Sequence, residues 1–223
     1  MQTYSQHGQD AWAFRTLREK KNGFFIELGA FDGITGSNTL MLERLGWQGI
    51  CIEPASWYFE RVCENRSCIC VNALIAGGDR PTALFLQSPD QMSGIADHRS
   101  WQAHEVHQIE MNTRPMVEVL RQCRAPREID YLSLDVEGAE IEILRDFPYG
   151  EYQLGLLTVE HNAASLPERR TVKNEMCNLL AGRGFRYVGD LVDDGLFCKP
   201  ELFDSAVQAL REQAVIASGP GKH

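Results

Sequence analysis

The sequence has no long hydrophobic run and no excess of positive charge. No apolar stretch approaches the ~18 residues that a membrane-spanning helix needs, and residues 1–7 lack the basic-then-apolar pattern of a secretory signal. The formal net charge is −9 over 223 residues, which opposes non-specific binding to phosphate backbones. We therefore expect a cytoplasmic protein that binds neither membranes nor nucleic acid.

The sequence also lacks paired Cys-x-x-Cys units, although it contains seven cysteines. This absence argues against a structural zinc site. Three histidines in an irregular segment, His98, His104 and His107, have no cysteine or carboxylate set that would complete a zinc site. We expect the cysteines to be reduced and mostly buried, as is usual in cytosolic proteins.

Strand-like and helix-like segments alternate along most of the chain. Short apolar runs are typical of buried parallel strands, and the segments between them have helical periodicity. Strands are expected at 23–28, 49–53, 67–75, 129–135 and 154–160, and helices at 37–45, 57–64, 139–147 and 167–181. This alternation predicts a doubly wound α/β fold with right-handed crossovers and a mostly parallel sheet.

The remaining segments predict smaller features of one domain, residues 1–217. An additional strand is expected at 82–86, an extended segment at 104–111, and a helix N-cap at Thr113 with Pro115 in the first turn. Segments 185–191 and 196–198 form a predicted hairpin, with its turn at Asp194-Gly195. A short helix at 203–213 and a flexible tail at 218–223 complete the chain.

A glycine-containing loop, Glu-Leu-Gly-Ala-Phe-Asp-Gly, runs from the first strand into the next helix. Glycines there let the backbone approach a ligand and present N–H groups at a helix N-terminus. Phe31 occupies the place of the second glycine in the Gly-x-Gly-x-x-Gly pattern. Because a pyrophosphate needs close approach at that place, the sequence disfavours a dinucleotide.

An acid ends the second strand, where it would accept the hydroxyls of a ribose. Glu53 lies 20 residues after Gly33, as in nucleoside-binding α/β proteins. Asn72 and Ala73 end the third strand and would lie near the base. These positions predict an adenosine-like ligand at the carboxyl edge of the sheet, although Glu53 alone could also be an exposed loop acid.

Acids and a histidine end the fourth and fifth strands. Asp135 and Glu137 could orient a hydroxyl, accept its proton or hold a hard cation, and His161 beside Glu160 could act as a general base. If Mg²⁺ takes part, Asp135 and Glu160 are the expected ligands. Alternatively, Glu137 and Glu140 only favour the N-terminus of the next helix, and His161 is structural.

Four segments of the chain together resemble the FkbM family of S-adenosylmethionine-dependent methyltransferases. They are Tyr-Ser-Gln-His-Gly-Gln-Asp at 4–10, FIELGAFDG at 25–33, GICIEP at 49–54 and IDYLSLDVEGAEIEIL at 129–144. The resemblance implies a Rossmann-like fold with a seven-stranded sheet and an antiparallel last strand. It also implies that the methionine part of the cofactor is surrounded by Glu27, Gly29, Ala30, Phe31 and Gly33, with Ser37 and Asn38 nearby.

The resemblance further implies that Glu53 and Asp135 contact the cofactor and that Gln6 approaches it from the N-terminal segment, residues 1–22. Members of the family commonly methylate hydroxyls of sugars or secondary metabolites, so a small hydroxylated acceptor is expected. Its pocket is expected to be built from residues 88–107 together with Asp135, Glu137 and His161. The candidates for its lining are Ser93, Gly94, Ile95 and Trp101. A nicotinamide-dependent oxidoreductase and a non-catalytic cofactor-binding partner subunit are the alternatives, and a homodimer is left open.

Overall fold

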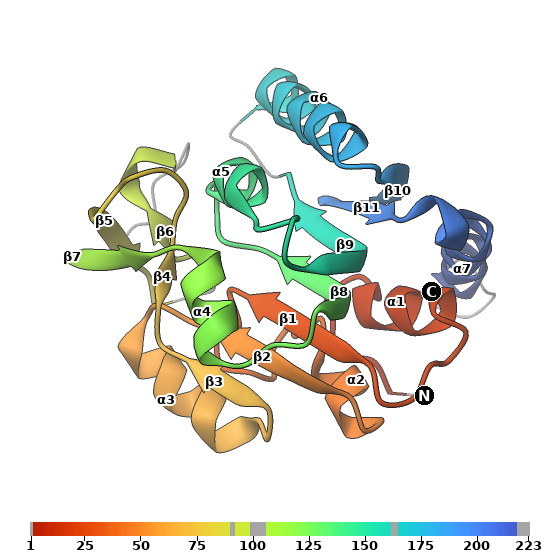
Figure 1. The fold of residues 1–223 in the computed structure, drawn as a ribbon, viewed down its shortest axis with the longest axis horizontal. Helices are drawn as coiled ribbons and strands as arrows, with labels where there is room; N and C mark the ends of the chain where they lie inside the picture. Colours follow the sequence, from red (N-terminus) through yellow and green to blue (C-terminus); the bar gives the residue numbers. More distant parts are fainter. Residues whose placement is uncertain (1, 90–91, 99–105, 162–164, 218–223) are drawn as a thin grey trace, which may run out of the picture.

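A seven-stranded sheet forms the centre of the computed structural model, which describes residues 2–89, 92–98, 106–161 and 165–217 (Figure 1). The strand order is β10-β11-β9-β8-β1-β2-β3. All neighbours from β9 to β3 are parallel, whereas β11 is antiparallel to both β9 and β10. The strands are β1 (Phe24–Leu28), β2 (Gln48–Ile52), β3 (Ile69–Val71), β8 (Glu128–Leu134), β9 (Gln153–Glu160), β10 (Arg186–Leu191) and β11 (Asp194–Cys198). This order confirms the predicted Rossmann-like fold with an antiparallel last strand.

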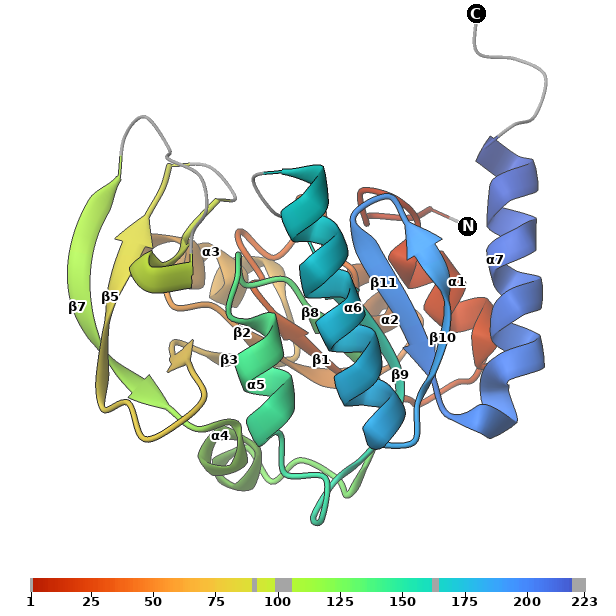
Figure 2. The ribbon, with the colours of Figure 1, turned by 90° about the horizontal axis from the view of Figure 1, so that it is seen from above.

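Helices cover both faces of the sheet (Figures 1 and 2). One face packs against α4 (Met116–Gln122), α5 (Glu140–Asp146) and α6 (Leu166–Gly182). The other packs against α1 (Gln9–Thr16), α2 (Leu40–Arg44), α3 (Ser56–Asn65) and α7 (Phe203–Ala217). In β1, Phe25 faces the second layer and Ile26 the first, and both are fully buried. A strand covered on both faces is expected to be mostly apolar, and in β1 only Glu27 departs from this.

A second, four-stranded sheet lies beside the first and was not predicted. Its order is β4-β7-β5-β6, from β4 (Leu74–Ile75), β5 (Thr82–Gln87), β6 (Gly94–Ile95) and β7 (His107–Arg114). The predicted strand at 82–86 is confirmed as β5. The prediction of one strand over 67–75 is wrong, because β3 and β4 belong to different sheets. Asn72, between them, donates its side-chain N–H to the carbonyl oxygens of Glu53 and Pro54, which turns the chain there.

Two predicted helix starts are also wrong. The helix expected from Ser37 begins only at Leu40, because Ser37 and Asn38 instead hydrogen-bond to the carboxylate of Glu27. Thr113 is not an N-cap but belongs to β7, and its N–H donates to the carbonyl oxygen of Pro81. The hydroxyl of Thr113 donates to the carbonyl oxygen of Arg80 and so does not cap the following helix.

The predicted hairpin forms, but its turn lies two residues earlier in the chain. Asp194 and Gly195 are in β11, where they pair with Leu191 and Asp190, so the turn is Val192-Asp193. A side chain at Gly195 would approach the ring of Phe197, with a Cβ contact of 2.9 Å. That glycine therefore gives room for packing within a strand, and the prediction of an Asp-Gly turn is wrong.

Three further observations complete the comparison with the sequence. All seven cysteines are free thiols, but only Cys51 and Cys198 are buried, so the expectation that most are buried is wrong. No helix in the described part of the chain is long and apolar enough to cross a membrane. Trp101, His104 and the tail at 218–223 lie outside the described residues.

Candidate active site

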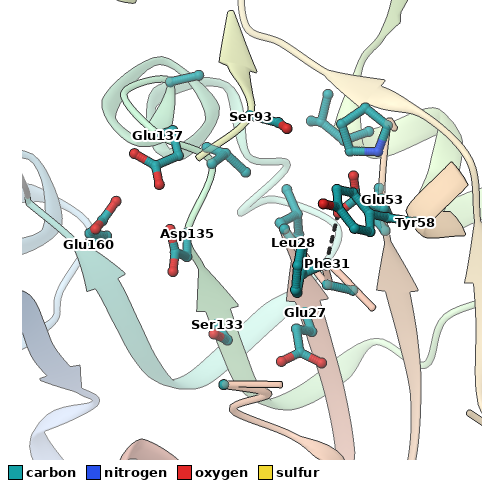
Figure 3. Close-up of a pocket in the computed structure, with 18 of the residues that line it drawn as sticks. Glu27, Leu28, Phe31, Glu53, Tyr58, Ser93, Ser133, Asp135, Glu137 and Glu160 are labelled. Carbon is teal, nitrogen blue, oxygen red and sulfur yellow. Dashed lines mark hydrogen bonds between the residues drawn. The ribbon is translucent and has the colours of Figure 1, made fainter. Parts of the chain in front are cut away.

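A cavity of about 260 Å³ opens at the carboxyl ends of β1, β2, β8 and β9 (Figure 3). Open α/β sheets bind ligands at this edge, and the volume lies just below the ~300–1,000 Å³ typical of ligand pockets. Of the predicted site residues, those that line the cavity are Gln6, Glu27, Gly29, Ala30, Phe31, Ser37, Asn38, Glu53, Ala73, Asp135, Glu137 and Glu160. Gly33, Asn72 and His161 are not among the described lining residues.

The loop after β1 turns tightly between two neighbouring strands. Gly29 has a φ of +80°, and a Cβ on it would lie 1.8 Å from the carbonyl oxygen of Asp135. Only glycine fits there. Phe31 also has a positive φ, of 49°. Its N–H donates to Oε2 of Glu53 at 2.9 Å, and its ring lies 4.2 Å from that of Tyr58.

Glu53 is held at the end of β2 by two backbone donors. Besides Phe31, the N–H of Ala55 donates to Oε1 at 2.8 Å. The residue is only 5% exposed, and burial raises its pKa to about 7 against these two hydrogen bonds. Each carboxylate oxygen has two lone pairs, so both can still accept from a ligand hydroxyl. Asn72 instead stabilises the end of β2, because its side-chain N–H donates to the carbonyl oxygen of Glu53.

Glu27 is part of a buried polar network at the cavity wall. Its carboxylate accepts from the hydroxyls of Ser37 and Thr39, from the N–H of Asn38, and from Arg66 at 2.8 Å. Arg66 is a residue that the sequence analysis missed. It also bonds to Glu43 at 2.6 Å, and its side chain is fully buried. No motif surrounds Arg66, so only the fold identifies it.

Asn38 lines the cavity and has an unused acceptor that is itself buried. Its Nδ2 donates to the hydroxyl of Ser133 at 2.9 Å. Its Oδ1 is buried and, within the described structure, has no hydrogen-bond partner. Buried polar atoms are rarely left in this way, so this oxygen is suited to the ammonium group of a ligand. Together with Glu53 for a ribose and the Phe31–Tyr58 ring pair, the cavity fits S-adenosylmethionine.

Three acids gather at the opposite end of the cavity from Glu53 (Figure 3). Carboxylate oxygens of Asp135, Glu137 and Glu160 all lie within 4.8 Å of one another. Burial, and then the charges of Asp194 and Glu140, raises the pKa of Asp135 to about 7. Burial, and then the charge of Asp135, raises the pKa of Glu160 well above its usual value. Asp135 and Glu160 are hydrogen-bonded to each other, so the pair holds a proton near neutral pH.

Glu140 holds the turn that presents these acids. Its Oε1 accepts from the N–H of Val136 at 2.9 Å and from that of Gly138 at 3.1 Å. Glu137 itself has a φ of 60°. The Asp-Val-Glu-Gly segment is therefore a fixed turn with Glu140 as its support, in line with the structural interpretation of Glu140.

His161 is not brought into the cavity. Its ring is buried, and Nε2 lies 3.2 Å from Oδ1 of Asp190, which also pairs with Lys173. Burial raises the pKa of Asp190, but the hydrogen bonds from His161 and Lys173 outweigh it and bring the pKa down to about 2. The position of His161 at the end of β9 could be predicted from the sequence, but the direction of its ring could not.

The rest of the lining combines predicted and unpredicted residues. Ser93 and Ile95, which the sequence placed in the acceptor pocket, line the cavity, as does Tyr58, which no motif indicated. The described lining includes no lysine, arginine or histidine. It includes six acids, namely Glu27, Glu53, Asp135, Glu137, Glu160 and Asp193.

Comparisons with known proteins agree with this architecture. The family model for the methyltransferase FkbM domain matches residues 27–187. No curated protein sequence matches the chain. The O-methyltransferase from Bacillus cereus in complex with SAH is similar in structure, at 9% identity and a TM-score of 0.45 over 88% of this chain and 80% of that one. Precorrin-6y C5,15-methyltransferase from Geobacter metallireducens GS-15 is similar at 11% identity and a TM-score of 0.45, over 84% of each chain.

The family match covers well over half of the sequence and includes the loop after β1, the end of β2 and the acidic turn after β8. The chain therefore belongs to the FkbM family of S-adenosylmethionine-dependent methyltransferases.

Proposed function

We propose that the chain transfers the methyl group of S-adenosylmethionine to a hydroxyl of an uncharged small molecule, such as a sugar or a secondary metabolite. The observation that carries this proposal is the acidic group Asp135, Glu137 and Glu160, which faces Glu53 across a cavity without basic residues in its described lining. Such a lining repels acceptors that carry a phosphate or a carboxylate, but it accepts neutral hydroxyls and the net positive charge of the donor.

The donor supplies an activated methyl group on a sulfonium, and the protein supplies position and electrostatics. Glu53 accepts the ribose hydroxyls, as an acid at this strand end does in nucleoside-binding folds. Oδ1 of Asn38 accepts from the amino group, and the ring pair of Phe31 and Tyr58 borders the base. Gln6, Ser37 and Ala73 complete the walls.

An alcohol has a high pKa, so it needs a base to become a good nucleophile. Asp135 is suited to this role because its pKa of about 7 lets it take a proton near neutral pH. Glu160 and Glu137 then orient the hydroxyl of the acceptor. His161 was the alternative base, but its bond to Asp190 turns Nε2 toward another partner.

A metal-assisted version uses the same three acids. Their oxygens are close enough together to hold one hard cation, Mg²⁺ in particular, which prefers carboxylate and water oxygens. Activity that is lost in EDTA and restored by Mg²⁺ would favour this version, and activity unchanged in EDTA would favour the proton-accepting pair.

Titration of S-adenosylmethionine and S-adenosylhomocysteine by calorimetry, with Glu53→Ala beside the wild type, tests the cofactor site. We expect micromolar binding that the substitution weakens about tenfold or more, or about 1.4 kcal/mol. Absence of binding by the folded wild type would overturn the proposal, and an NAD(H)-induced rise in melting temperature would favour the oxidoreductase.

A screen of hydroxylated acceptors, read as formation of S-adenosylhomocysteine, tests the reaction. Turnover on a neutral polyol or phenol, and none on its phosphorylated form, is expected. Cofactor binding without turnover on any acceptor would favour the non-catalytic subunit. Cytoplasmic location, the absence of nucleic-acid and membrane partners, and a homodimer stay predictions from the sequence.

A further inference from the structure

The N-terminal strap, defined here as residues 4–8, runs along one wall of the cavity before α1 begins. Gln6 lines the cavity, and its neighbour Ser5 forms a parallel β-bridge with Gly36, which lines the cavity as well. The strap therefore contacts the loop that follows β1 through its backbone. It belongs to the Ser-Gln-His-Gly-Gln-Asp motif, whose other polar residues have no part in the proposed function so far.

Asp10, on α1, holds the strap in place through hydrogen bonds to its carboxylate. Its side chain is completely buried, and each of its carboxylate oxygens accepts two hydrogen bonds. Oδ2 accepts from the N–H of Tyr4 at 2.8 Å and of Ser5 at 3.4 Å. Oδ1 accepts from the hydroxyl of Ser5 at 2.6 Å and from the N–H of Ala11 at 2.7 Å. All four partners are donors, so this site requires a carboxylate.

Gln9 ties the same strap to the acidic end of the cavity. Its Oε1 accepts from the N–H of His7 at 2.9 Å, and its Nε2 donates to Oδ2 of Asp194 at 2.7 Å. Asp194 is the residue of β11 that pairs with Glu160, and its neighbour Asp193 lines the cavity. Asp10 and Gln9 thus fix the strap to the cofactor loop on one side and to the acid-bearing strands on the other.

We propose that Asp10 and Gln9 are positioning residues for ligand binding, which hold the strap so that the side chain of Gln6 contacts the bound methyl donor. This proposal rests on the proposed function for the identity of the ligand. Asp10 touches no ligand itself, since its oxygens are occupied by the strap and by α1. It acts through Ser5 and Gln6, and an amide in its place would set N–H groups against donors.

A double-mutant cycle on S-adenosylhomocysteine binding tests the proposal. The variants are Asp10→Asn, Gln6→Ala and the two combined, with dissociation constants from calorimetry. We expect Asp10→Asn to weaken binding about tenfold, which is about 1.4 kcal/mol. Because Asp10 acts through Gln6, adding Asp10→Asn to Gln6→Ala should raise the dissociation constant by less than about twofold. If the two substitutions acted independently, their effects on the dissociation constant would multiply. Full multiplication, or wild-type affinity in Asp10→Asn, would overturn the proposal.

Asp130→Asn is the matched control. Asp130 also accepts a backbone N–H, from Phe24 at 2.9 Å, but at the opposite end of the sheet from the cavity. Its substitution should lower stability and leave the dissociation constant unchanged. If Asp10→Asn does not fold, Ser5→Ala removes the 2.6 Å bond to Asp10 and the 3.0 Å bond from the N–H of Gly8, and it should weaken binding in the same Gln6-dependent way.

Amide hydrogen exchange separates this proposal from the proposed function, because it needs no ligand. In Asp10→Asn, exchange should become faster at residues 4–8 and near Gly36, and stay slow in the central strands. If the wild-type protein binds no S-adenosylhomocysteine, the proposed function is wrong. The exchange experiment still tests whether Asp10 holds the strap in place. Unchanged exchange in Asp10→Asn would overturn the positioning role.

Discussion

Arg66 donates a 2.8 Å hydrogen bond from its guanidinium to Oε2 of Glu27, in a place where both side chains are buried. The same guanidinium bonds to Glu43 and Thr39. Removing the arginine would leave two carboxylates without their cation beside the cofactor loop. Removing one partner of a buried ion pair is strongly destabilising, because it leaves an uncompensated buried charge. Replacing both partners by apolar residues of similar volume is often neutral.

We therefore expect Arg66→Met to lower the free energy of unfolding by about 3–5 kcal/mol, measured by urea denaturation. Arg145→Met is the control, because Arg145 pairs with Glu175 at 3.0 Å on the surface, where both side chains are more than half exposed. Such a pair contributes about 0–1 kcal/mol. Equal losses in the two variants would contradict the role of the buried network.

Cofactor binding is expected to strengthen as the pH rises through about 7. Burial raises the pKa of Glu53 to about 7, so the carboxylate loses its proton only near that pH. The ionised form has more acceptor sites for the ribose hydroxyls than the protonated form. Calorimetric titration of S-adenosylhomocysteine between pH 5.5 and about 8.5 checks this. Glu53→Gln should bind weakly and lose this dependence; the same dependence in the variant would assign it to another group.

The stability of the protein should carry the opposite dependence through Asp135. Its folded pKa of about 7 lies above the ordinary value of 3.8, so the folded state holds a proton that the unfolded chain releases earlier. This contribution to stability is complete below about pH 4 and is lost as the pH rises through about 7. Asp135→Asn should reduce this fall, although Glu53 and Glu160, whose pKa values are also raised, still contribute to it; urea denaturation across that pH range would measure the difference. Parallel curves for variant and wild type would contradict the raised pKa.

Asp135 and His161 can be separated as candidate bases by their effects on turnover. With an acceptor found in the hydroxyl screen, Asp135→Asn should lower kcat about 100-fold or more, the usual loss of a general base. His161→Gln should keep kcat within about threefold, because its ring bonds to Asp190 outside the cavity lining. The reverse order of effects would restore His161 as the base.

The strand ends show how far the sequence alone could place the site. Apolar runs that end in Glu53, Asp135 and Glu160 predict buried parallel strands, and parallel strands bring their carboxyl ends to one edge. The structure confirms that these three acids line one cavity. Gly29 could be predicted as well, because a strand that turns beside its neighbour leaves no room for a side chain.

Other features depend on partners that are distant in the sequence. The ring of His161 faces Asp190, 29 residues away, and the carboxylate of Glu27 faces Arg66, 39 residues away. Asn72 ends β3 because it bonds to carbonyl groups at the end of β2, and Gln9 ties the strap to Asp194, 185 residues away. Hydrophobic periodicity reports whether a position is buried, so the sequence determined the sheet, its edge and the residues along it. The direction of each polar side chain follows from whichever donor or acceptor the folded chain brings within about 3 Å, and only the tertiary structure decided that.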